Sequence, residues 1–167
     1  MFFVEGRESS EIDCPECGGR LNYRDLKKRI CREEGGKKCW VMIRRLRCEK
    51  CGRYHNELPD CFVPYKHYIT EVISGVLDGI VTPDDRESED YPTEQTMVRW
   101  KEWFAQNRSN MEGYLRNAGY TILNKGKEFL LSEDSLLENL QKQCRDWLEH
   151  VLRLIYNTGG FLQAIPW

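Results

Sequence analysis

Two short cysteine motifs constrain this chain more than any other feature. Cys14 and Cys17 form one Cys-x-x-Cys-Gly sequence, and Cys48 and Cys51 form a second. Two residues between the thiolates let both sulfurs reach one metal ion at tetrahedral angles, and the following glycine relieves crowding where the backbone turns toward the sulfurs. The two pairs complete a closed four-cysteine shell, which predicts one structural zinc ion and no open position for a catalytic water.

The alternative is that the two motifs are unrelated redox or chance pairs. A thioredoxin-type pair lies in a βαβ unit, and no such pattern surrounds either motif. The apolar start, residues 1–4, is followed at once by Glu5 and Arg7, so we expect no secretory signal. A cytoplasmic location keeps the eight cysteines reduced, which favours metal binding over disulfides.

The sequence between the motifs predicts a β-hairpin. Residues 21–32 read as an extended strand, 33–38 as a turn with two glycines, and 40–47 as a second strand rich in β-branched and aromatic residues. A third strand is expected over 53–58. The hairpin brings the second cysteine pair beside the first, so residues 1–62 are predicted to form a zinc ribbon of two or three strands.

The other cysteines leave alternatives open. Cys31 and Cys39 flank the turn symmetrically and are expected to face each other, as a second metal pair or as a plain thiol pair. Cys61 and Cys144 are expected to be buried thiols. His55 and His67 lie near the second motif and either could replace a cysteine ligand, but four cysteines already fill the shell.

Apolar residues recur at helical spacing over 63–167 and predict a helical bundle, so the expected fold class is α+β. The expected helices cover 65–77, 93–119 and 132–156, with the first and last residues of the second acting as its caps. The stretch 107–110 is poor in helix formers and is expected to bend or break that helix.

The charge of the chain is unevenly distributed. The net charge is −2, yet residues 20–53 contain 13 Lys and Arg against 4 Asp and Glu, so the remainder carries −11. This asymmetry suggests a basic working surface on an acidic body. No run of about 18 apolar residues exists, so no membrane span is expected.

Several stretches together resemble the N-terminal zinc ribbons of insertion-sequence transposases, and more closely a small uncharacterised bacterial family of transposase-like zinc-ribbon proteins. They are the first motif with Gly18 and Gly19, the stretch 43–53, Leu58-Pro59-Asp60, residues 63–73, residues 93–100 and the ending 155–162. The resemblance implies a DNA-binding ribbon and helices without the catalytic domain of a transposase.

The stretch 93–101 resembles the recognition helix of a helix-turn-helix. In such a helix Thr93, Gln95, Thr96 and Arg99 would face a DNA groove. The pattern is degenerate, because the acidic, proline-bounded loop 82–91 replaces the expected short helix and would repel phosphates. The alternative is that the aromatic residues of this stretch pack the bundle.

The expected function is a non-catalytic DNA-binding accessory protein of mobile-element type that binds double-stranded DNA. The expected phosphate contacts on the ribbon are Lys27, Lys28, Arg29, Arg32, Lys37, Lys38, Arg44, Arg45 and Arg47. These charges could instead be merely solvated. The other candidate is a zinc-stabilised protein-interaction module that binds a host or mobile-element protein. No nucleophile–base pair or phosphate loop is recognisable, so neither enzymatic activity nor a small-molecule substrate is expected.

Overall fold

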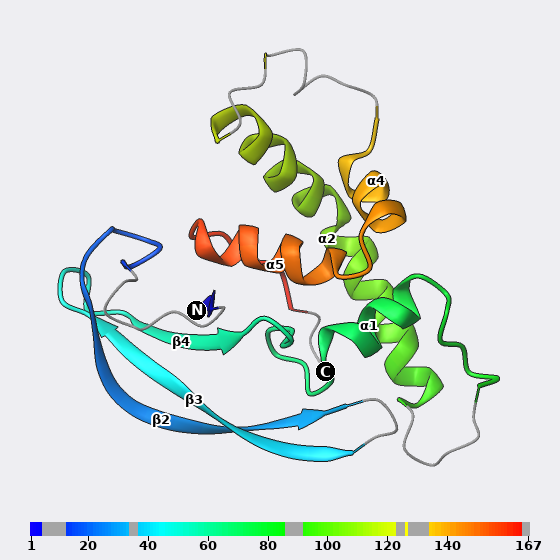
Figure 1. Ribbon diagram of the computed structural model, residues 1–167, viewed down its shortest axis with the longest axis horizontal. Coiled ribbons are helices and arrows are strands. Elements are labelled where there is room, and N and C mark those ends of the chain that lie inside the picture. Colours follow the sequence, from blue (N-terminus) through cyan, green and yellow to red (C-terminus); the bar gives the residue numbers. More distant parts are fainter. Residues whose placement is uncertain (5–12, 34–36, 86–91, 123–125, 127–133, 165–167) are drawn as a thin grey trace.

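The computed structural model describes the chain except for residues 5–12, 34–36, 86–91, 123–125, 127–133 and 165–167. The described residues form a four-stranded sheet followed by four helices, an α+β fold as expected (Figure 1). The strands are β1 (Phe2–Val4), β2 (Leu21–Arg32), β3 (Lys38–Cys48) and β4 (Tyr54–Pro59), and the helices are α1 (Thr70–Leu77), α2 (Glu94–Thr121), α4 (Leu136–Gln143) and α5 (Trp147–Asn157).

The sheet is built around the long hairpin of β2 and β3. Its strand order is β1-β4-β3-β2, with β3 antiparallel to both of its neighbours. Pairing in the hairpin runs from Leu21 opposite Cys48 to Arg32 opposite Lys38, with an irregularity between Tyr23 and Asp25. All three expected strands are therefore confirmed to within two residues at their ends.

Strand β1 was not expected from the sequence. It pairs parallel to β4, with Phe2 opposite Glu57 and Phe3 opposite Leu58. The side chain of Asn157, at the end of α5, fixes this strand: Phe3 N–H donates to Asn157 Oδ1 at 2.7 Å, and Asn157 Nδ2 donates to Phe3 O at 3.0 Å. The far end of the chain thus holds the short first strand in place.

The sheet buries apolar residues on both faces. Phe2 belongs to a small core with Cys14, Leu21, Leu46 and Cys48. Consecutive strand residues point to opposite faces, and Phe3 belongs to a large core that combines Ile43 and Leu58 with the buried side chains of the helices. Figure 1 shows the helices gathered on one side of the curved hairpin. The predicted boundary between a zinc ribbon, residues 1–62, and a helical bundle, residues 63–167, stays a prediction. Strand and helix residues share the large core, so the two parts pack against each other.

The helix expected over 65–77 is wrong in its first part, because α1 begins only at Thr70. Residues 67–69 lie along the end of β2 instead: Arg32 N–H donates to His67 O at 2.7 Å, and Ile69 N–H donates to Arg32 O at 3.1 Å. Tyr65 has a φ of 63°, which is outside the right-handed helical region. Pairing with the hairpin therefore overrides the helical spacing of these apolar residues.

The second expected helix neither breaks nor stops where the sequence suggested. α2 is continuous through 107–110 and runs past Gly119, so the expected break and the expected C-cap are wrong, although Thr93 is its N-cap as expected. A bend at 107–110 stays a prediction. Asn107 is buried, and its Nδ2 donates to Trp103 O at 2.9 Å and to Gln163 O at 3.0 Å. A residue of poor helix propensity thus stays in the helix because it anchors the C-terminal segment.

The helix expected over 132–156 is divided. α4 ends at Gln143, Cys144 is extended, and α5 begins at Trp147, whose Nε1–H donates to Asp78 Oδ2 at 3.0 Å. The two parts have separate N-terminal residues and buried faces, which a single apolar stripe in the sequence does not distinguish. The start of this expected helix, 132–133, lies outside the described residues.

Candidate metal centre

The two cysteine motifs fold into two matching turns. In the first, Gly18 N–H donates to Cys14 O at 2.8 Å, and in the second Gly52 N–H donates to Cys48 O at 3.1 Å. Both glycines have positive φ, 64° and 71°, which side chains with a Cβ adopt only with strain. The glycine after each motif is therefore part of the turn that presents the sulfurs.

The four sulfurs converge on one point between these turns. Cys14 Sγ lies 3.8 Å from Cys51 Sγ, Cys17 Sγ lies 3.5 Å from Cys48 Sγ, and all four atoms lie within 4.8 Å of one another. A tetrahedral site with metal–sulfur bonds of about 2.3 Å has sulfur–sulfur edges of about 3.8 Å. A Cβ added to Gly19 would stand 2.9 Å from Cys48 Sγ, so the chain leaves space where the sulfurs gather. These four cysteines can hold one metal ion.

The protonation of these thiols makes metal binding depend on pH. Burial raises the pKa of Cys17 to about 12, whereas the backbone N–H of Cys51, 3.5 Å from Cys48 Sγ, lowers the pKa of Cys48 to about 7. Cys48 is thus the thiol that ionises most readily, and a bound metal must displace the protons of its neighbours. Metal binding therefore releases protons and weakens in acid.

His55 lies beside the four-cysteine centre as a neighbour of one ligand. Its Nε2 is 3.3 Å from Cys14 Sγ, and the residue is only 1% exposed. Burial lowers the pKa of His55, which favours the neutral ring. A metal-bound thiolate at Cys14 could only accept a hydrogen bond, so the Nε2–H of His55 would then be the donor. His55 Nδ1 has no hydrogen-bond partner among the described residues. The ring thus offsets charge at the sulfurs.

The structure gives several of the expected DNA-contacting arginines partners within the chain. Arg44 forms an ion pair with the buried carboxylate of Glu57, and Arg45 donates to both carboxylate oxygens of Asp25 at 2.8 and 2.5 Å. Both pairs lie close to the cysteine end of the hairpin. Contact of these two arginines with phosphate stays a prediction, but each is already engaged in holding neighbouring strands together.

Two further arginines hold the other end of the hairpin to the rest of the chain. Arg29 Nη2 donates to Val63 O at 2.6 Å and to Lys66 O at 2.8 Å. Arg32 Nη1 donates to Tyr68 Oη at 3.1 Å. Burial lowers the pKa of Arg29. These contacts explain why the segment before α1 follows the hairpin.

The expected lysine contacts form a different group. Lys27, Lys28, Lys37 and Lys38, here called the lysine tip, are exposed on the half of the hairpin away from the cysteines. None of the four has an ion pair among the described residues, and Lys28 Nζ lies 4.4 Å from the centre of the exposed Trp40 ring. Arg47 is also exposed and lies over the Tyr54 ring at 5.7 Å, at the cysteine end. The lysine tip therefore carries positive charge that is not paired with a carboxylate among the described residues.

The expected recognition residues lie in the first turns of α2. Thr93 Oγ1 accepts from Thr96 N–H at 3.3 Å, Gln95 is exposed and Arg99 is half-buried. Trp100, the next residue, is buried in the large core. Residues 78–93 separate α1 from α2, far more than the three or four residues of a helix-turn-helix.

This end of α2 nevertheless lies near the hairpin. The Tyr68 ring stacks edge-on against Trp100 at 5.1 Å between centres, and Tyr68 Oη is the group that receives the Arg32 hydrogen bond. The structure therefore places the start of α2 and the end of β2 against the same tyrosine. Most of the acidic loop 82–91 lies outside the described residues.

The remaining cysteines do not form a second converging group. Cys31 and Cys39 are paired directly across the hairpin, as expected, and burial together with Cys39 raises the pKa of Cys31 to about 12. Cys61 is exposed, so its expected burial is wrong, and Cys144 is half-buried. Within the described part of the chain, only the four-cysteine centre brings three or more such ligands together.

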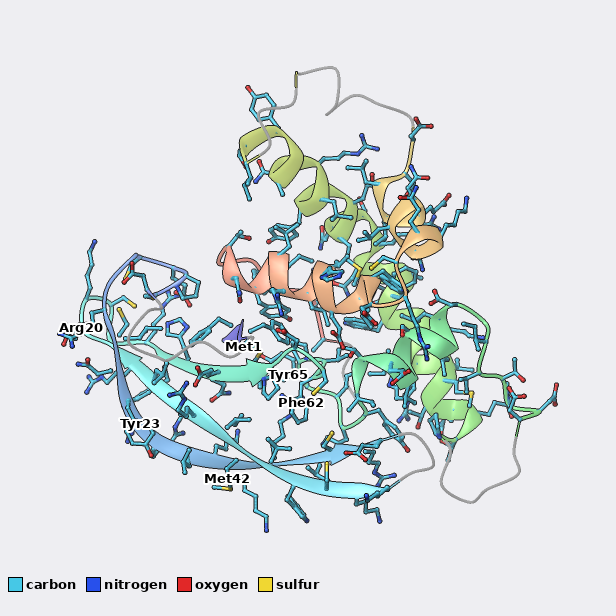
Figure 2. All side chains as sticks on the ribbon, in the orientation of Figure 1. Met1, Arg20, Tyr23, Met42, Phe62 and Tyr65 are labelled. Carbon is cyan, nitrogen blue, oxygen red and sulfur yellow. The ribbon has the colours of Figure 1, made fainter. Side chains whose placement is uncertain are left out.

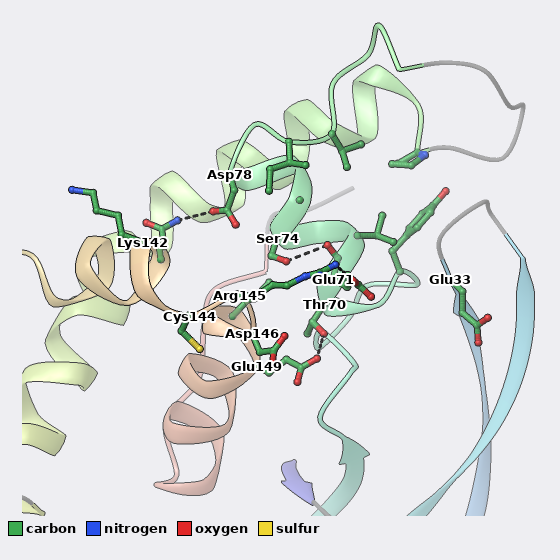
Figure 3. A pocket seen from close by; sticks show the side chains of 18 of the residues that line it. Glu33, Thr70, Glu71, Ser74, Asp78, Lys142, Cys144, Arg145, Asp146 and Glu149 are labelled. Atoms are coloured by element: carbon green, nitrogen blue, oxygen red, sulfur yellow. Dashed lines mark hydrogen bonds and ion pairs between the residues drawn. The ribbon is translucent and has the colours of Figure 1, made fainter.

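A cavity of about 800 Å³ lies apart from the metal centre, between α1 and the bend that joins α4 to α5 (Figure 3). No pattern in the sequence predicts this cavity. Thr70 Oγ1 donates to Glu149 at 2.5 Å, and Arg145 forms an ion pair with Glu71 at 2.6 Å. None of the residues expected to bind metal or DNA lines this cavity.

Comparison with known proteins identifies the family. Residues 14–100 match the family DUF6431, described as a domain of unknown function. The chain belongs to this family. The DUF6431 match begins at the first cysteine of the four-cysteine centre and ends at Trp100, so it covers both cysteine motifs, the hairpin, β4 and α1. No curated protein and no solved structure matches the chain. None of the helices in its described part has the length and apolar character needed to cross a membrane.

Proposed function

We propose that this chain is a non-catalytic DNA-binding protein in which a structural zinc ion holds the four-cysteine end of the hairpin and the lysine tip contacts phosphates. A shell of four thiolates is the usual structural zinc site, and it leaves no coordination position for a substrate. Cys14, Cys17, Cys48 and Cys51 would hold the ion. Zinc would supply folding energy to the two turns and no chemistry.

The observation that carries the DNA part of the proposal is the difference between the hairpin's arginines and lysines. Arg44 and Arg45 are paired with carboxylates, whereas the lysine tip has no such pairs in the described chain. Lysine ammonium groups that are free of internal partners can neutralise phosphates and release the counterions condensed on DNA. Thr93, Gln95, Thr96 and Arg99 in α2 are proposed as secondary contacts.

The test is a titration of duplex DNA at several salt concentrations. The double variant Lys28→Gln/Lys38→Gln removes two charges from the lysine tip. The control variant Lys101→Gln/Lys142→Gln removes two exposed charges from α2 and α4. If both tip lysines contact phosphates, the slope of log K against log salt falls by about 1.8 units or less in the first variant only.

Zinc content serves as the folding control for both variants. An unchanged affinity and salt slope in Lys28→Gln/Lys38→Gln, with one zinc retained, would reject the lysine tip as the DNA surface. Equal losses in both double variants would show that only total charge matters, and would also reject it. The other candidate is a protein-interaction module in which the acidic loop or the C-terminal helix holds a partner, and it predicts that the parent protein does not bind duplex DNA.

A further inference from the structure

One face of the tip half of the hairpin carries exposed apolar side chains. Cross-strand partners point to the same face, and the pairs Lys28–Met42 and Ile30–Trp40 lie next to each other there. Leu26, Trp40 and Met42 are 50–59% exposed. In Figure 2, Met42 projects from the side of the hairpin opposite the helices. We call Leu26, Lys28, Ile30, Lys38, Trp40 and Met42 the outward face.

The outward face combines exposed apolar side chains with lysines. Leu46, four residues beyond Met42 on the same face of β3, is fully buried in the small core. The same strand face is thus covered near the cysteines and bare near the tip. Lysines lie among the apolar residues, since Lys28 covers the Trp40 ring. Protein interfaces are depleted of lysine, and their charges collect at the rim rather than the centre.

A nucleic acid strand fits this mixture better than a protein does. Surfaces that bind single strands combine basic side chains, which follow the backbone, with aromatic rings on which bases stack. An exposed cation–π contact is weak, so Lys28 can leave Trp40 when a base takes its place. The freed ammonium group then remains beside the bound nucleotide.

The surroundings of the hairpin favour unpaired bases over an intact duplex. A two-stranded ribbon can enter the major groove of a duplex only if it is free on its edges and faces. Here the edge of β2 at Arg32 is bonded to residues 67–69, and Arg29 anchors the inner face to Val63 and Lys66. The outward face is the more open of the two faces in this half of the hairpin, because Leu26, Trp40 and Met42 are exposed there.

We infer that the outward face binds single-stranded DNA, with a base stacked on Trp40 and phosphates held by Lys28 and Lys38. This inference rests on the proposed DNA-binding function and narrows its substrate to DNA with unpaired bases. The full chain loaded with zinc is to be titrated with a dT oligonucleotide of about 16 nucleotides and with a duplex of the same length.

Substitutions of Trp40 measure the contribution of base stacking to affinity separately from the contribution of the lysine charges. Trp40→Ala should weaken binding of the dT strand by about 5- to 150-fold and leave duplex binding unchanged. Trp40→Phe, which retains a ring, should recover most of the loss. Phe161→Ala removes another exposed aromatic residue and should change neither affinity. Trp40 is exposed, so these substitutions should leave zinc content and melting temperature as in the parent protein.

Fluorescence gives an independent readout. Trp100, Trp103 and Trp147 are buried. With Trp167 replaced by phenylalanine in both proteins, quenching by a stacked base should come from Trp40 and disappear in Trp40→Phe although binding persists. Equal binding of strand and duplex, with no effect of Trp40→Ala, would overturn the inference and leave the proposed function standing if the lysine variants still lose affinity. A parent protein that binds neither form of DNA would overturn both.

Discussion

The two halves of the β2–β3 hairpin use their positive charge in opposite ways. Next to the cysteines, Arg44 and Arg45 pair with Glu57 and Asp25, so charge there joins one strand to another. Toward the turn, Arg29 and Arg32 are hydrogen-bonded to the segment before α1, and the lysine tip is left in solvent. The basic side chains of the hairpin therefore form two groups. The arginines named here are bonded within the chain, and the lysines of the tip are available to a partner.

The two halves of the hairpin also pack against different hydrophobic cores. The cysteine half packs on a small core that includes Cys14 and Cys48, two residues of the four-cysteine centre. The tip half contributes Ile43 to the large core, which is filled mainly by the helices. The cysteine half should therefore depend on metal for its folding, and the tip half on the helices.

The largest effect should follow from loss of a metal ligand. Cys48→Ser should abolish stoichiometric zinc binding, which is worth about 10–16 kcal/mol in small zinc domains. Hydrogen exchange should then show loss of protection in residues 13–24 and 44–57, while α5 stays protected. Cys39→Ser is the control, because Cys39 lies outside the four-cysteine centre. One equivalent of zinc retained by Cys48→Ser would show that the assignment of the centre is wrong.

Substitutions of the two phenylalanines of β1 test the two cores one at a time, because Phe2 belongs to the small core and Phe3 to the large core. Phe2 and Phe3 are both at most 3% exposed, so each change to alanine should lower stability by about 3–5 kcal/mol. Phe2→Ala should chiefly weaken zinc affinity in competition with a chelator, because Phe2 packs beside Cys14 and Cys48. Phe3→Ala should lower the melting temperature with zinc affinity little changed. Identical behaviour of the two variants would mean that the two cores unfold as one.

Arg29 and Arg45 give a matched test of charge in the two halves of the hairpin. Arg29→Met should destabilise the protein to urea by about 3 kcal/mol, because it leaves Val63 O and Lys66 O without their charged donor. Arg45→Met should cost about 0.5 kcal/mol, because the side chains of Arg45 and Asp25 are each 37% exposed. A loss for Arg45→Met as large as that for Arg29→Met would contradict the difference between the halves.

The four-cysteine centre and the hairpin were predictable because their signals are local. Two Cys-x-x-Cys-Gly motifs dictate convergent sulfurs, and the strand sequences between them dictate the pairing that brings the motifs together. The ion pairs were not predictable in the same way. Arg44 and Lys28 look alike in the sequence, and only the register of β4 places Glu57 within reach of Arg44.

The errors in the helical part came from contacts between distant segments. Tyr68 and Ile69 have helical spacing, yet residues 67–69 pair with Arg32 because hydrogen bonds to a strand edge were available. Asn107 stays helical because it binds Gln163, and β1 forms because Asn157 holds Phe3. Each outcome depends on a partner more than 30 residues away, which spacing within one segment does not encode.

The smallest effect concerns Lys66, in the loop that anchors the tip half. Its ammonium lies 4.8 Å from the centre of the Trp103 ring, and burial lowers its pKa from 10.5 to about 8. Between these two values the unfolded chain binds a proton that the folded chain has released, so this group makes the protein more stable as pH rises from about 8 to 10.5. Below pH 8 the folded protein must hold a buried charge.

Lys66→Met should therefore stabilise the protein at pH 7 by about 1 kcal/mol, and this advantage should shrink as pH rises from 8 to 10.5. Urea unfolding at a series of pH values measures both effects, and the thiols, which titrate in the same range, cancel when variant and parent are compared. Lys101→Met, at an exposed position on α2, should show no such trend. A variant less stable than the parent at pH 7, or an advantage that does not change with pH, would mean that Lys66 keeps its charge at little cost. Lys66 would then carry its charge at as little cost to stability as the exposed lysines of the tip. The contrast between the two halves of the hairpin would depend on the arginines alone.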